Sequence, residues 1–206
     1  MSKDRKQTRW LVFTTVIILS AAIISRIQAH DSGEAMLRTL AATGPNSSLG
    51  DQAEVFNGFI GTWDCDYSFH TADGKISHQS GELMFGWVLD GLAVQDIWIS
   101  YPKSAGKERS IGTSVRFFDT KAKIWKVVFV NPAFGSAINV EGGVVGDRIV
   151  LRGKDIDGAE IRWSFNDIKP GSFTWRGEKS RDNGKTWVLE EEHRMTRRDD
   201  AKKVGG

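Results

Sequence analysis

The chain has 206 residues, with 28 lysines and arginines against 26 aspartates and glutamates, and one cysteine, Cys65. A single cysteine forms no intramolecular disulfide and no cysteine-based metal site, and a nearly balanced charge gives no general reason to bind nucleic acid. Stability must therefore come from packing, and the length suits one domain with a sizeable core.

Residues 1–29 have the three-part form of an export signal, in which a basic start precedes an apolar run from Trp10 to Ile24 and a cleavage site at Ala29. The run is shorter than the roughly 20 apolar residues of a membrane span. We therefore predict a periplasmic or secreted protein. An uncleaved signal, which would anchor the protein to a membrane, is the alternative. The signal holds five of the basic and one of the acidic side chains, so the mature chain has a formal net charge of −2.

A small, polar region follows the predicted signal. Residues 30–50 contain the loop signal Gly44-Pro45-Asn46-Ser47-Ser48, and we interpret them as a flexible linker with at most a short helix over 34–42. Residues 51–59 are expected to form a helical or turn-like entry to a domain that spans 51–198. Residues 199–206 are expected to be a disordered tail.

From Gly61 onward, apolar and polar residues alternate with period two, interrupted by Asp-Gly, Asn-Gly and Pro-Gly pairs, which predicts an all-β fold. The connections are too short for crossover helices, so neighbouring strands should be antiparallel in an up-and-down meander. About ten strands remove their exposed edges by closing into a barrel. The predicted strands are 62–69, 76–85, 92–100, 111–118, 124–131, 136–145, 148–154, 159–168, 173–181 and 186–195.

The two ends of this domain resemble those of lipocalins and related calycins. Phe59-Ile60-Gly61-Thr62-Trp63 is similar to their Gly-x-Trp opening, and Arg194, Arg197 and Arg198 form a basic cluster at the other end of the domain. The resemblance implies that one of these arginines covers Trp63, as a cation over an indole face.

A longer stretch, from Phe56 to Arg198, resembles a family of calycin-like bacterial domains of unknown function. That resemblance implies a β-barrel and no particular activity. Nitrobindin-like haem barrels are distantly similar, but their extended glycine-rich signature after Gly-Thr-Trp is absent. The segments that carry the longer resemblance are 81–82, 87–91, 116–119 with Trp125, 162–165 and 173–178.

Ser180 to Trp187 has the spacing Ser-x-Asp-x-Gly-x-x-Trp and resembles the Asp-box of sialidase propellers. A propeller needs about four or more four-stranded blades, which is more than this chain supplies. Trp125, Trp163 and Trp187 are separated by 38 and then 24 residues, so no propeller repeat is present. We therefore interpret the segment as a turn in which the Asp182 carboxylate accepts backbone N–H bonds while Trp187 packs beneath it.

A two-residue turn at Asn183-Gly184 would pair Arg176 with Glu191 and Thr174 with His193. If this face points inward, the cavity wall has the composition of a small-ligand site, with apolar walls and a few placed polar groups. If it points outward, the same charges form an exposed ion pair of little energetic value. The face contains Arg176, Glu178, Trp187, Leu189, Glu191 and His193.

The leading functional hypothesis is a barrel that binds a small, largely apolar ligand in its cavity, since barrels of about eight strands already have room for one. The strand arginines Arg116, Arg162 and Arg176 would suit a polar or anionic end of that ligand. No catalytic residue, metal site or cofactor is assigned. The candidate ligand-binding residues are Trp63, Arg116, Trp163, Arg176, Glu178, Trp187, Glu191 and His193.

Three alternatives stay open. One is an enzyme that modifies a lipid or terpenoid, with Glu178, Glu191 or His193 as the proton-transfer group. Another is a barrel that binds haem or nitric oxide through His193. The third is an envelope structural protein with a filled core.

Overall fold

The computed structural model describes residues 31–71, 73–101 and 108–198. The predicted signal at 1–29 and the predicted tail at 199–206 lie outside the described residues. The chain divides into two compact units, Met1–Ala41 and Ala42–Gly206. In the first unit residues 31–40 are helical, and no helix within the described ranges is long and apolar enough to cross a membrane.

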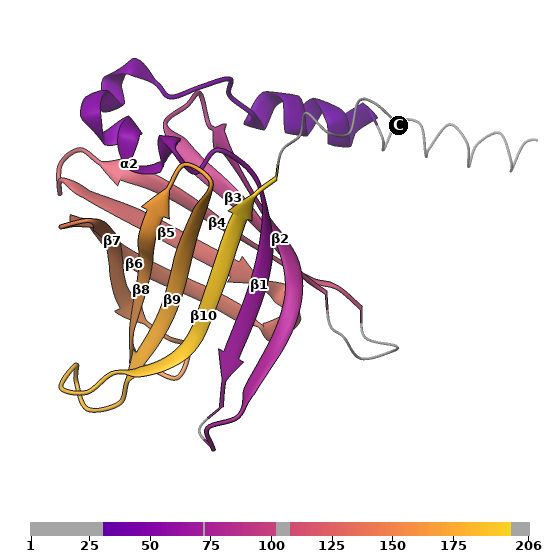
Figure 1. The fold of residues 1–206 in the computed structure, drawn as a ribbon. Helices are drawn as coiled ribbons and strands as arrows, with labels where there is room; N and C mark the ends of the chain where they lie inside the picture. Colours follow the sequence, from indigo (N-terminus) through magenta and orange to yellow (C-terminus); the bar gives the residue numbers. More distant parts are fainter. Residues whose placement is uncertain (1–30, 72, 102–107, 199–206) are drawn as a thin grey trace, which may run out of the picture. The chain divides into compact units, whose positions relative to one another are not determined.

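The second unit is a closed barrel of ten antiparallel strands in sequential order, with β1 and β10 completing the ring (Figure 1). This confirms the predicted all-β meander and its closure. The strands are β1 (Gly61–His70), β2 (Ile76–Val88), β3 (Ala93–Tyr101), β4 (Ser110–Asp119), β5 (Ile124–Asn131), β6 (Ser136–Val145), β7 (Arg148–Lys154), β8 (Glu160–Lys169), β9 (Ser172–Ser180) and β10 (Val188–Arg197).

Alternation along the strands separates the core from the surface, as the first strand shows. Trp63, Cys65 and Tyr67 are buried in β1, whereas Asp64 and Asp66 between them are exposed. Successive side chains of a strand point to opposite faces, so the apolar set fills the barrel and the aspartates face outward.

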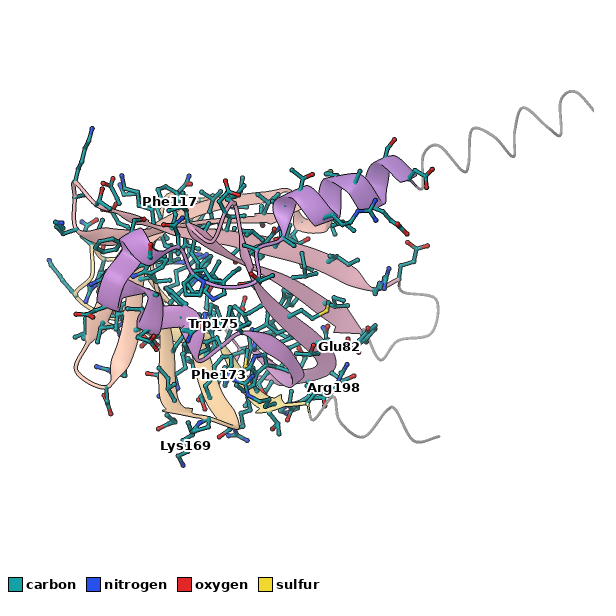
Figure 2. The ribbon with its side chains drawn as sticks, turned by 90° about the horizontal axis from the view of Figure 1, so that it is seen from above. Glu82, Phe117, Lys169, Phe173, Trp175 and Arg198 are labelled. Atoms are coloured by element: carbon teal, nitrogen blue, oxygen red, sulfur yellow. The ribbon has the colours of Figure 1, made fainter. Side chains whose placement is uncertain are left out.

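Two short helices cover one end of the barrel, η1 (Ser47–Ala53) and α2 (Glu54–Asn57). Phe56 and the following Phe59 are buried there, and the Phe59 ring lies 4.9 Å from that of Phe173 and 5.1 Å from that of Phe165. Figure 2 looks onto this end, with Phe173 within the outline of the barrel and Lys169 at its periphery. We call it the closed end.

An arginine covers Trp63, the first tryptophan of the barrel, at this closed end, as the resemblance to calycins implies. The Arg197 guanidinium carbon lies 4.1 Å from the centre of the Trp63 ring. Arg197 also donates hydrogen bonds to the backbone carbonyls of Gly58, Ile60 and Pro170. It therefore ties the last strand to the entry segment and to the β8–β9 turn.

The connection between β9 and β10 has the predicted hydrogen bonds but not the predicted length. Asp182 accepts hydrogen bonds from the backbone N–H and the hydroxyl of Thr186, at 2.8 and 2.7 Å, so the turn interpretation is confirmed. Asn183 and Gly184 both have positive φ, as an Asn-Gly turn requires. The strands end at Ser180 and begin again at Val188, however, so the connection is longer than two residues.

The register predicted for this hairpin is wrong beyond Leu189. Leu189 pairs with Glu178, as a two-residue turn would require, but Glu191 then pairs with Gly177 and Glu192 with Arg176. Glu190 is the extra residue of a β-bulge, which shifts every later pair by one position. The predicted pairs of Arg176 with Glu191 and Thr174 with His193 therefore do not form.

Candidate functional site

The barrel contains a cavity of about 380 Å³. It extends from the core to the end opposite α2, because its lining includes Phe134 of the β5–β6 connection and Asp155 and Ile156 of the β7–β8 connection. We call this the open end.

The cavity walls are largely aromatic. Trp163 is at the centre of this wall, with its ring 5.7 Å from that of Trp175 and 5.8 Å from that of Phe129. Flat, apolar walls of this kind bury an apolar or aromatic molecule without requiring a particular polar pattern. The aromatic lining consists of Phe69, Phe85, Trp98, Phe129, Phe134, Trp163, Phe165 and Trp175.

His193 is a polar group enclosed by this aromatic wall. Its ring stacks on Trp175 at 5.0 Å with an interplanar angle of 13° and meets the edge of Tyr67 at 4.7 Å. Nε2 lies 3.0 Å from Oε2 of Glu191, whereas Nδ1 is buried and has no hydrogen-bond partner among the described residues. Burial also raises the pKa of the neighbouring Tyr67, so its phenol stays neutral.

Arg116 lies deeper in the cavity and is almost fully buried. Its guanidinium pairs with Asp96 of β3 and lies over the rings of Phe56 and Phe85, at 5.1 and 4.9 Å from their centres. Asp96 also accepts a hydrogen bond from the backbone N–H of Ser114. The charge of Arg116 is therefore balanced within the protein, while its Nε and Nη1 have no hydrogen-bond partner among the described residues.

The bulge in β10 separates the residues of the predicted face. Glu191 and His193 line the cavity, but Arg176 does not, and its Nε donates to Glu192 at 2.9 Å. Glu178 reaches the cavity lining, yet its carboxylate accepts two hydrogen bonds from Arg162, at 2.7 and 2.8 Å. Each of the three strand arginines proposed to meet a polar or anionic end of the ligand already pairs with a carboxylate of the barrel.

Two predicted tryptophans also lie away from the cavity. Trp63 is fully buried at the closed end, beneath Arg197, and is not part of the cavity lining. Trp187 lies beneath the guanidinium of Arg162, which is 4.3 Å from its ring, and is likewise not part of the lining. Of the candidate residues, the structure therefore brings Arg116, Trp163, Glu178, Glu191 and His193 to one cavity.

Sequence reasoning missed several residues that line the cavity. Asp96 lies between Val94 and Trp98 in an alternating strand, so its inward position could have been read from period two. Glu190 gave no such signal, because a bulge is not visible in the alternation of a charged run. Trp175 precedes Arg176 on β9, so the predicted register would place it on the face opposite His193, whereas the bulge places the two rings in contact.

No protein-family model matches the sequence, and no curated protein matches it significantly. Among solved structures, Rv2717c from M. tuberculosis is similar with a TM-score of 0.55 and 13% identity, covering 75% of this chain and 99% of that one. The S-type phycobiliprotein lyase CPES from Guillardia theta is similar with a TM-score of 0.52 and 13% identity, covering 71% and 92%. Together with the closed ten-stranded ring, these similarities show a calycin-like barrel fold.

Proposed function

We propose that this protein is an exported calycin-like barrel that binds a small, largely apolar molecule in its cavity. The observation that carries the proposal is a cavity of about 380 Å³ with eight aromatic side chains in its lining and an open end. Small-molecule sites have this composition, with apolar walls and a few placed polar groups. The signal-like residues 1–29 support export, and the similarity to a phycobiliprotein lyase is consistent with a barrel that accepts ligands.

The test is native mass spectrometry and tryptophan fluorescence on the protein without residues 1–29. Trp98, Trp163 and Trp175 line the cavity, so a bound molecule should change their emission. We expect a co-purified or added apolar ligand to bind one to one and to quench this emission. Adding haem to the same sample and recording a visible spectrum tests the haem alternative through its Soret band. If no class of apolar compound binds, the proposal is wrong.

A second candidate is proton-transfer catalysis in the same cavity. It is favoured by the contact between His193 and Glu191, in which a carboxylate orients a buried imidazole, the arrangement that general acid–base catalysis uses. An isomerisation needs no co-reactant, because the proton removed from one carbon of the substrate returns to another carbon of the same molecule.

This candidate is tested with a β,γ-unsaturated cyclic ketone in deuterated water. Catalysis predicts faster isomerisation and deuterium incorporation, both lost in His193→Gln and retained in Glu141→Gln, whose carboxylate is exposed on β6. Equal rates with and without the protein would exclude this activity.

A further inference from the structure

The outer part of the cavity has more carboxylates than cations. Four carboxylates line it near the open end, and two cations pair with them. Lys179 pairs with Asp155 and lies 3.7 Å from Glu190, while Arg162 pairs with Glu178. Glu191 pairs with His193 alone among the described residues. The four lining carboxylates are Asp155, Glu178, Glu190 and Glu191.

The deep part of the cavity does not offset this excess of negative charge. Arg116 is the lining cation there, and Asp96 neutralises it within the wall. An anionic ligand would therefore pass the carboxylates of the open end and find no net positive charge at the bottom. A cationic ligand would gain attraction along the same path, because opposite charges at short range in a partly desolvated site interact strongly.

The β-bulge places two adjacent carboxylates, Glu190 and Glu191, in the lining of the cavity. In a regular strand one of two consecutive side chains faces away, but both Glu190 and Glu191 line the cavity. Their side chains are 44% and 40% exposed, so they are accessible to an entering molecule. Gly177 lies opposite Glu191, and the Trp175 ring occupies the space that a side chain at Gly177 would take.

A second observation, the unpartnered ring nitrogen of His193, also points to a hydrogen-bond donor on the ligand. The His193 side chain is 4% exposed, lines the cavity and leaves Nδ1 without a partner. When the neutral ring donates its Nε2 proton to Glu191, Nδ1 becomes an acceptor that needs a donor. A protonated amine that reaches Nδ1 would supply that donor, and the face of Trp163 would attract its charge.

We infer that the cavity binds an apolar or aromatic amine in its protonated form. The ammonium group lies near Glu190, Glu191 and His193, and the apolar body lies among the tryptophans. This inference rests on the proposed ligand-binding function and deepens it by naming the charge of the ligand.

The test uses three probes with one ring system and three charges, namely 1-naphthylmethylamine, 1-naphthylmethanol and 1-naphthoate. Their affinities for the protein without residues 1–29 are measured by titration calorimetry at pH 7. We expect the amine to bind about tenfold or more tighter than the alcohol, and the carboxylate to bind weakest.

Glu190→Gln and Glu191→Gln should each weaken amine binding about tenfold and alcohol binding much less, because the alcohol has no charge. Glu141→Gln is the matched control, because it removes the same charge from an exposed position on β6 and should leave all three affinities unchanged. If the alcohol or the carboxylate binds as tightly as the amine, this inference is overturned while the cavity function stands. If none of the three binds, this inference fails, and the cavity function fails with it if no other class of apolar compound binds either.

Discussion

The guanidinium of Arg116 and the carboxylate of Asp96 form an ion pair between β4 and β3 inside the barrel, with side chains only 3% and 7% exposed. Removing one partner leaves the other charge buried and uncompensated. We expect Asp96→Asn to lower the free energy of unfolding by about 3–5 kcal/mol, measured by urea denaturation.

The matched control for this pair removes both charges. Arg116→Met combined with Asp96→Leu should restore stability to within about 1 kcal/mol of the wild type, because neither variant side chain needs a partner. A double variant no more stable than Asp96→Asn would show that the pair is not the source of the loss.

Arg197 should not be replaceable by lysine. A lysine keeps the charge over Trp63, but its single ammonium group cannot reproduce the planar fork that reaches the carbonyls of Gly58, Ile60 and Pro170. We expect Arg197→Lys to cost about 1–3 kcal/mol in urea denaturation. Arg194→Lys, on the exposed face of the same strand, should change stability by less than about 0.5 kcal/mol.

Asp182 should make the stability of the barrel depend on pH in the acid range. Hydrogen bonds from Thr186 and Ser180 lower its pKa from 3.8 to about 2. Because the pKa is lower in the folded state, its stabilisation is present above about pH 4 and lost as the pH falls towards 2. Asp182→Asn should have a lower melting temperature at pH 7 and a smaller loss of stability between pH 4 and pH 2. Parallel curves for the two proteins would contradict this.

The space opposite Glu191 should not tolerate even one added methyl group. A Cβ at Gly177 would lie 2.9 Å from the Trp175 ring, so Gly177→Ala should displace that ring and cost about 1–3 kcal/mol. The emission of the cavity tryptophans should shift as well. Gly143→Ala, on β6 with nothing within 4 Å of the added atom, should leave both stability and emission nearly unchanged.

Most of the fold could be predicted from the alternation of apolar and polar residues and from the positions of the turn residues. All ten strands and their antiparallel order were predicted, because alternation and short connections leave few other arrangements. The arginine over Trp63 was implied only by the resemblance to calycins. The site was less predictable, since it depends on cross-strand register. A bulge at Glu190 changed which residues face Arg176, and no compositional signal marks a bulge inside a run of three glutamates.

The Arg116–Asp96 contact is a second case in which the sequence did not predict the cross-strand partner of a residue. Both residues lie on predicted strands, but their pairing depends on how β3 and β4 align across the connection that joins them. The sequence therefore indicated an inward arginine without indicating that its charge was already neutralised. For this reason we propose a cationic ligand, whereas the strand arginines alone suggested a ligand with a polar or anionic end.

Glu190, the extra residue in β10, also affects how mutation could change the cavity during evolution. Deleting the codon for Glu190 would remove one negative charge from the open end of the cavity and remove the bulge from β10. Every other residue pair between β9 and β10 would keep its present partner. If the cavity binds a cation as inferred, this deletion should weaken that preference and leave the other cross-strand pairs as they are.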